Sequence, residues 1–199
     1  MPRPVSLTAL AAASAAPTRP EGRCRGSLLL GWAANLDRRW GPGTAEQLRR
    51  EAGVAAASLP DAPAPEAWLP AWTQLAVTRW LLHKRLDGDP CALIRLFTED
   101  AARDGGVASR ALAKAGPGVM YRAAGLLHPH VYDVGRARGS VSRDQVSVHF
   151  SGAPLIADPT WRIIQWVAND LGVRAMGWSQ ARLEGVDDDN GGFELVIRR

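Results

Sequence analysis

The chain has 199 residues, of which 46% are hydrophobic, so it can bury one sizeable core but is short for two independent domains. Its formal net charge is +4. Most of that charge comes from residues 1–25, which contain four arginines and one glutamate, and the rest of the chain is close to neutral. Nucleic-acid binding requires clustered cations, so this charge pattern argues against nucleic acid as a partner.

The N-terminal segment, residues 1–25, is rich in alanine, proline and arginine, and we expect it to be a flexible tail before a single domain over residues 26–199. A signal peptide is the alternative, because Arg3 precedes an apolar run that ends in a small-residue site at 13–15. No stretch approaches the roughly 20 apolar residues that span a bilayer. The two cysteines form no CxxC pair, which favours reduced thiols and a cytoplasmic protein, or an exported one if the segment is a signal peptide.

Residues 26–128 have the spacing of a helical layer. In the first stretch, 26–41, large apolar residues recur every four positions and share one helix face, namely Leu28, Trp32, Leu36 and Trp40. Capping, glycine and proline signals then indicate further helices at 44–53, 71–86, 90–103, 107–116 and 117–128. Four prolines between positions 60 and 70 mark a connector between two of them. This half is predicted to hold five or six helices.

The hydrophobic period changes to two in residues 137–199. Val146, Val148 and Phe150 alternate with polar residues, and the same alternation occurs in the last stretch, 193–197. Asp158 and Pro159 begin a helix that ends near Gly172. The order is β-β-α-β-β, so the sequence predicts an α+β domain with an antiparallel four-stranded sheet covered on one face by the helical layer.

The stretches RGSLLLGWAANLDRRWGPGTAEQLRREAG, VSVHFSGAPL, WRIIQWVANDLGV and FELVIRR, in this order, resemble the superfamily of heme nitric-oxide-binding domains, 4-vinyl reductase domains and transport-particle subunits. The chain looks most similar to an uncharacterised domain family abundant in myxobacteria. The resemblance covers residues 26–199 and consists of element order and apolar placement. It implies a helical layer over a sheet, and a sensor or scaffold role in signalling.

The heme-binding branch of that superfamily requires a proximal histidine and a Tyr-x-Ser-x-Arg motif. Ser151 matches the serine, but His149 stands at the tyrosine position and Ala153 at the arginine position. The region where the proximal ligand is expected, around residues 115–121, contains no histidine. Heme without an axial protein ligand loses its main bond, so no cofactor is expected.

The candidate binding residues lie where the helical half meets the sheet half. His128, His130 and Tyr132 are polar groups at this seam, and Trp80 and Trp166 are large aromatic residues that a ligand cavity would use. With Asp133 the two histidines also form a possible metal set, although contacts at a helix end are the plainer explanation of His128.

Cys91 follows Asp89-Pro90 at a predicted helix start, where the dipole favours thiolate, so it is the candidate reactive thiol. A small apolar residue packed in the helix is the plainer interpretation of the same cysteine. No phosphate-binding glycine loop or nucleophile elbow is present in the sequence.

Three hypotheses remain. The first is a non-enzymatic sensor or scaffold domain that binds a small hydrophobic ligand or a protein partner. The second is a homodimeric interaction module whose core is filled by its own tryptophans. The third is a metal- or thiol-dependent enzyme that uses His128 and His130, or Cys91. An open cavity would favour the first hypothesis, and a cavity filled by side chains would favour the second. Metal-ligating side chains that converge on one point, or an activated thiol, would favour the third.

Overall fold

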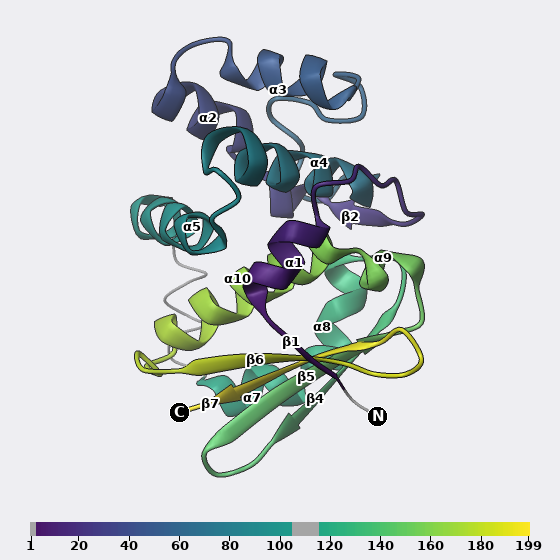
Figure 1. Ribbon diagram of the computed structural model, residues 1–199, viewed down its shortest axis with the longest axis vertical. Helices are drawn as coiled ribbons and strands as arrows, with labels where there is room; N and C mark the ends of the chain where they lie inside the picture. The colour runs from purple at the N-terminus through teal and green to yellow at the C-terminus, as the bar shows by residue number, and fades with distance from the viewer. Residues whose placement is uncertain (1–2, 105–115) are drawn as a thin grey trace.

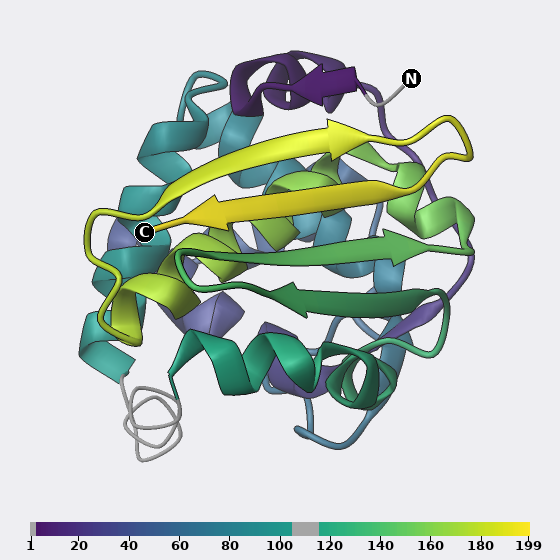
Figure 2. The same ribbon diagram turned by 90° about the horizontal axis from the view of Figure 1, so that it is seen from below.

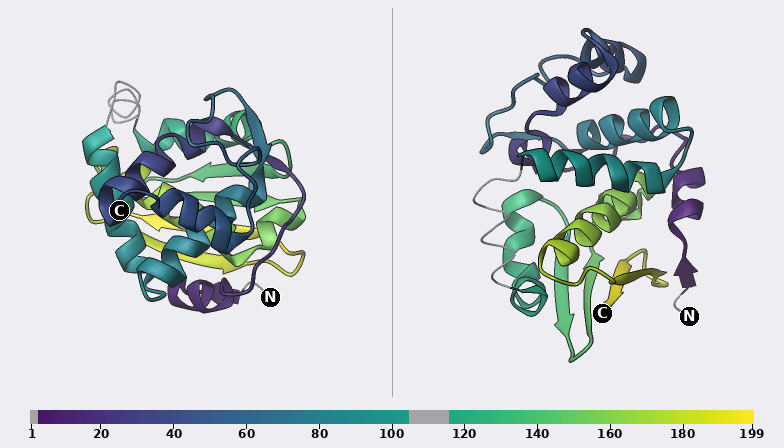
Figure 3. Two further views of the ribbon diagram at one scale, coloured as in Figure 1. Left: turned by 90° about the horizontal axis from the view of Figure 1, so that it is seen from above. Right: turned by 90° about the vertical axis from the view of Figure 1, so that its left-hand side faces the viewer.

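The computed structural model describes residues 3–104 and 116–199, so the helix predicted at 107–116 falls outside the described residues. Helices are stacked on one face of an antiparallel sheet, which confirms the predicted α+β class (Figure 1). Helix α10 (Pro159–Ala175) lies on the sheet, and α4 (Ala71–Trp80) and α5 (Pro90–Asp104) lie on α10. Helices α2 (Trp32–Trp40) and α3 (Thr44–Ala52) form the layer furthest from the sheet (Figure 3, right).

The sheet has five antiparallel strands in the order β1-β6-β7-β5-β4 (Figure 2). They are β1 (Arg3–Val5), β4 (Arg136–Val141), β5 (Gln145–Ser151), β6 (Arg182–Asp187) and β7 (Phe193–Arg198). Strands β4 and β5, which are consecutive in the chain, pair antiparallel, and so do β6 and β7. Phe193, Leu195 and Ile197 are each 0% exposed, because the two-residue alternation points them all toward the helices.

The prediction of four strands is wrong, because β1 adds a fifth strand beside β6. Arg3 pairs with Asp187, and Val5 with Gly185. A three-residue strand is too short to show alternation in the sequence. Pro4 also argues against a strand in the sequence, because proline has no backbone N–H to donate. It is tolerated here because β1 is an edge strand, which pairs on one side only.

The described part of the expected flexible tail, residues 3–25, is folded into the domain. Helix α1 (Leu7–Ala13) begins at Ser6, whose Oγ accepts from the backbone N of Ala9 at 3.1 Å, and the helix packs against α10. Strand β2 (Arg23–Arg25) pairs with β3 (Trp68–Pro70) in a separate two-stranded sheet. Helix α1 buries only two side chains, which is too few to produce an amphipathic pattern in the sequence.

The helical half follows the predicted order closely. Its helices are the 3₁₀ turn η1 (Gly26–Leu29), α2 (Trp32–Trp40), α3 (Thr44–Ala52), α4 (Ala71–Trp80), the π-helical turn η2 (Leu81–Arg85), α5 (Pro90–Asp104), α7 (Pro117–Arg122) and α8 (Ala124–Val131). A short helix α9 (Pro154–Ala157) precedes α10 (Pro159–Ala175). Helices α7 and α8 run alongside edge strand β4 (Figure 2). Gly139 permits this approach, since a Cβ there would lie 1.6 Å from the carbonyl oxygen of Tyr121.

Helix α10 is capped as predicted and separates the sheet core from the upper helices. Asp158 Oδ1 accepts from the backbone N of Thr160 at 2.7 Å and of Trp161 at 3.1 Å. Trp161 is 0% exposed and meets Phe150 edge to face, with ring centroids 5.0 Å apart. On its other side, α10 places Ile164, Ala168 and Leu171, which are about one helical turn apart, toward α4 and α5.

Candidate functional site: a cavity between the helical layers

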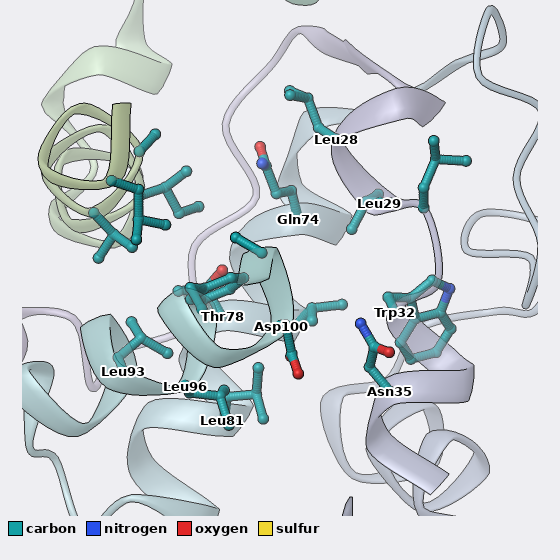
Figure 4. Close-up of a pocket in the computed structure, with 18 of the residues that line it drawn as sticks. Leu28, Leu29, Trp32, Asn35, Gln74, Thr78, Leu81, Leu93, Leu96 and Asp100 are labelled. Carbon is teal, nitrogen blue, oxygen red and sulfur yellow. The ribbon is translucent and has the colours of Figure 1, made fainter. Parts of the chain in front are cut away.

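A cavity of about 520 Å³ lies between α2, α4, α5 and α10 (Figure 4). Each wall is one face of a helix, formed by residues that recur at helical spacing. Helix α2 contributes Trp32, Leu36 and Trp40, which lie four residues apart along one side of the helix. The size and the enclosure by four helices are typical of a small-molecule site.

The walls are mainly aliphatic and aromatic. Leu93, Leu96 and Phe97 come from α5, and Ile164 and Leu171 come from α10. Two side chains at the rim, Leu28 and Leu30, are exposed to 37% and 52%. The cavity therefore offers apolar contact over most of its surface and has an apolar entrance.

A short hydrogen-bond chain forms one polar end of the cavity. Gln165 Nε2 donates to Tyr132 Oη at 3.3 Å, and Tyr132 Oη donates to Gln74 Oε1 at 2.9 Å. Tyr132 and Gln74 are 3% and 8% exposed, and burial raises the pKa of Tyr132 above its usual range, so the phenol stays neutral. The Gln74 amide nitrogen has no partner among the described residues.

A second polar group lies away from Gln74, next to Asn35 and Asp100 (Figure 4). Arg39 donates to Asp100 at 3.2 Å and to Glu99 at 2.8 Å, and these two carboxylates raise the pKa of the guanidinium above its usual value. Arg39 and Asp100 are the only charged residues in the described lining, and they are paired with each other.

Tyr132 is the predicted ligand-binding residue that the structure places in the cavity. His128 lies behind it, 5% exposed, with the two ring centroids 5.4 Å apart and its Nε2 3.0 Å from the carbonyl oxygen of Val134. Burial lowers the pKa of His128, so the imidazole is neutral at physiological pH and supports the aromatic packing around Tyr132.

The three candidate metal ligands do not converge. His128 points inward and His130 is exposed, while Asp133 accepts from the backbone N and from Nε of Arg23, at 2.6 Å each. In the part of the chain that the structure describes, no three His, Cys, Asp or Glu side chains are placed to hold a metal ion. Asp133 instead links Arg23 of β2 to the segment between α8 and β4, where the helical half meets the sheet half.

The two predicted tryptophans lie elsewhere. Trp166 packs against the sheet, since a Cβ on Gly185 of β6 would be 2.7 Å from its ring. Trp80 lies on the far side of α4, where its Nε1 donates to Glu51 at 2.8 Å. There it lines a second, charged hollow, which we call the basic groove; its lining includes Arg19, Arg50, Glu51, Trp72, Arg79, Trp80, His83 and Lys84.

The two thiols have opposite environments. Cys91 is exposed on the first turn of α5, and its backbone N donates a hydrogen bond to Asp89 Oδ1 at 2.8 Å. Cys24 is 0% exposed between β3 and Tyr132, and burial raises its pKa to about 12. Neither cysteine lines the cavity.

The sequence carries a signal for the two tryptophans that line the cavity. Trp32 and Trp40 belong to the four-residue apolar stripe of the first helix, and that stripe is wider than contact with α3 alone requires. Gln74 and Gln165 carry no comparable signal, because a polar residue on a helix is ordinarily solvent-facing. Only the packing of α4 and α10 shows that both are turned inward.

No protein-family model matches the chain, and no curated protein or solved structure shows a significant match to it. Among residues 3–104 and 116–199, none of the helices combines the length and the apolar character needed to cross a membrane.

Proposed function

We propose that this protein is a non-enzymatic sensor or scaffold domain that binds a small hydrophobic ligand in the cavity between α2, α4, α5 and α10. The observation that carries the proposal is the cavity of about 520 Å³ with apolar walls and a few convergent polar groups. Binding sites for small molecules generally have this size and composition.

The energetics of such a cavity suit a ligand of modest affinity. Burying apolar surface contributes about 0.8 kcal/mol per CH₂ group before association costs are subtracted. At about 0.3 kcal/mol per non-hydrogen atom, a ligand of about 20 atoms would bind with a Kd of tens of micromolar or tighter. That range fits a domain that responds to the concentration of its ligand.

The open volume favours a ligand over the alternative of a homodimeric module with a filled core. In a filled core the tryptophans would occupy the space between the layers, whereas Trp32 and Trp40 line its wall. A distant relationship to the heme nitric-oxide-binding, 4-vinyl reductase and transport-particle superfamily is part of the same proposal. Its support is the run of elements β4-β5-α9-α10-β6-β7 that follows the helices, to which β1 adds a fifth strand.

The proposal is tested by titrating the purified chain with Nile red, an uncharged apolar dye, and following its fluorescence. Ala168 lines the cavity and Ala175 lies two turns further along α10, and both are exposed. Ala168→Phe places an aromatic ring in the cavity and should weaken binding at least tenfold. Ala175→Phe adds the same ring outside the lining and should leave binding unchanged. Equal binding by all three chains would refute the site.

A further inference from the structure

The two charged residues of the described lining, Arg39 and Asp100, form an ion pair with each other. Arg39 also donates to Glu99, and Asp100 also lies 3.4 Å from Arg38 and 3.0 Å from Arg103. The side chains of Arg38 and Arg103 are 44% and 48% exposed, so they face water. An ion entering the cavity would therefore compete with existing ion pairs for the counter-charge in the lining.

A charged ligand would also lose its hydration without compensation. Moving an ionised group out of water costs several kcal/mol unless it is paired and fully hydrogen-bonded. Away from Arg39 and Asp100, the described lining provides hydroxyl and carboxamide groups as its polar contacts, with the rest apolar. These groups bond well to uncharged polar atoms and do not repay the desolvation of an ion.

The polar end of the cavity has unused hydrogen-bonding capacity. Gln74 Oε1 accepts from Tyr132, whose hydroxyl accepts from Gln165 Nε2. This chain leaves Gln74 Nε2 as a donor, and the side-chain oxygen Oε1 of Gln165 as an acceptor, without a partner among the described residues. The Gln74 amide nitrogen is not among the fully buried unpaired atoms of the described residues, so it is open to the cavity, where a ligand atom can accept a hydrogen bond from it.

From these observations we infer that the cavity selects an uncharged ligand: an elongated apolar molecule with one hydroxyl, carbonyl or carboxamide group that bonds to Gln74 and Gln165. This inference rests on the proposed function and deepens it by naming the ligand class. The hydrogen-bonding group lies at the Tyr132 end, and the apolar part extends along α5 and α10 toward the tryptophans of α2.

The experiment compares four probes of equal chain length, 1-decanol, decanoate, decylammonium and decane, as competitors of Nile red at neutral pH. We expect 1-decanol to bind at least tenfold more tightly than either ion. We also expect it to bind more tightly than decane, because only the alcohol completes the bond to Gln74. Decanoate or decylammonium binding as tightly as 1-decanol would overturn the inference while leaving the proposed function intact. Failure of every probe, and of the dye itself, would instead remove the proposed function.

Two substitutions assign the hydrogen bond. Gln74→Leu keeps the size of the side chain and should abolish the preference for 1-decanol over decane while the ions remain excluded. Gln180→Leu is the matched control, because Gln180 is an exposed glutamine outside the described lining, and it should leave the preference unchanged. If Gln74→Leu does not fold, Gln165→Leu provides the same comparison through the second partner. A preference that survives both glutamine substitutions in the cavity, or that is lost in Gln180→Leu alone, would contradict the assignment.

Discussion

Helix α4 has a different hollow on each of its two sides. Gln74, Val77 and Thr78 line the apolar cavity, whereas Trp72 and Arg79 line the basic groove. The two hollows are similar in volume, about 520 and 620 Å³, so the difference between them is chemical. The cavity has a single neutralised charge pair, while the groove has several exposed cations around one carboxylate.

The comparison shows why size alone does not define a binding site. In the basic groove, Arg50, Lys84 and Glu51 are exposed and hydrated, so an incoming ion gains little from them. In the cavity, most of the described lining is apolar, so each polar atom that lacks a protein partner bears on which ligand is favoured. The same helix serves both because all of its residues except Trp72 are buried.

The largest expected effect is on the groove side, at the one buried cation of α4. Arg79 is 9% exposed, donates to the carbonyl oxygen of Ser14 at 2.8 Å and to Thr160 at 3.1 Å, and lies 3.5 Å from buried Asp158. Arg79→Met leaves that carboxylate without its charge partner, and we expect a loss of about 4 kcal/mol in the free energy of unfolding. Urea denaturation measures it.

The control for Arg79 is Arg50→Met, which removes an exposed cation from the same groove. Its side chain is open to solvent, and we expect a change of less than about 0.5 kcal/mol. Equal effects of the two substitutions would mean that Arg79 is hydrated and that the groove side of α4 is not tied to α1 and α10.

The next largest effect is the difference in unfolding free energy between substitutions at a packed position of α4 and at one that faces the cavity. Leu75 is 0% exposed, and Leu75→Ala creates a new void at a cost of about 3 kcal/mol. Val77 lines space that already exists, so Val77→Ala should cost about 1 kcal/mol. Similar losses, measured by urea denaturation, would indicate that the cavity is closed in solution and that Val77 is packed as tightly as Leu75.

Elements that carry a local signal are predictable from the sequence in either half of the chain, for physical reasons that these positions illustrate. Phe193, Leu195 and Ile197 alternate with polar residues because one sheet face is buried, and that period is visible without a structure. Asp158-Pro159 marks the start of α10 through local hydrogen bonding alone. Strand β1 escaped prediction because its pairing with β6 joins residues at opposite ends of the chain.

The candidate site was predicted only in part. Tyr132 was selected because it lies at the seam between the halves, and it does line the cavity. Trp80 and Trp166 were selected for their size, but size does not say which way a buried side chain faces. Helix α4 has no polar face, so the sequence could not show that Gln74 and Arg79 point to opposite sides.

The smallest effect is a pH dependence that should separate the two sides of α4. His83 lines the basic groove 2.9 Å from Ser14 Oγ, and its pKa is lowered first by burial and then by Arg79. In the unfolded state a histidine has a pKa of about 6.5. The unfolded state therefore takes up the proton first, so stability is complete above that pH and falls as the pH decreases below it. His128, whose pKa is also lowered by burial, contributes with the same sign.

His83→Gln should reduce the slope of unfolding free energy against pH between about 7.5 and 5.5, and His128 contributes to the part that remains. No histidine lines the cavity among the described residues, so binding of 1-decanol to the folded chain should be the same at both pH values. A slope unchanged in His83→Gln would place that imidazole in water. Alcohol binding that weakens with acid would mean that the two sides of α4 are coupled, because protonation in the groove would then be transmitted through the helix to Gln74.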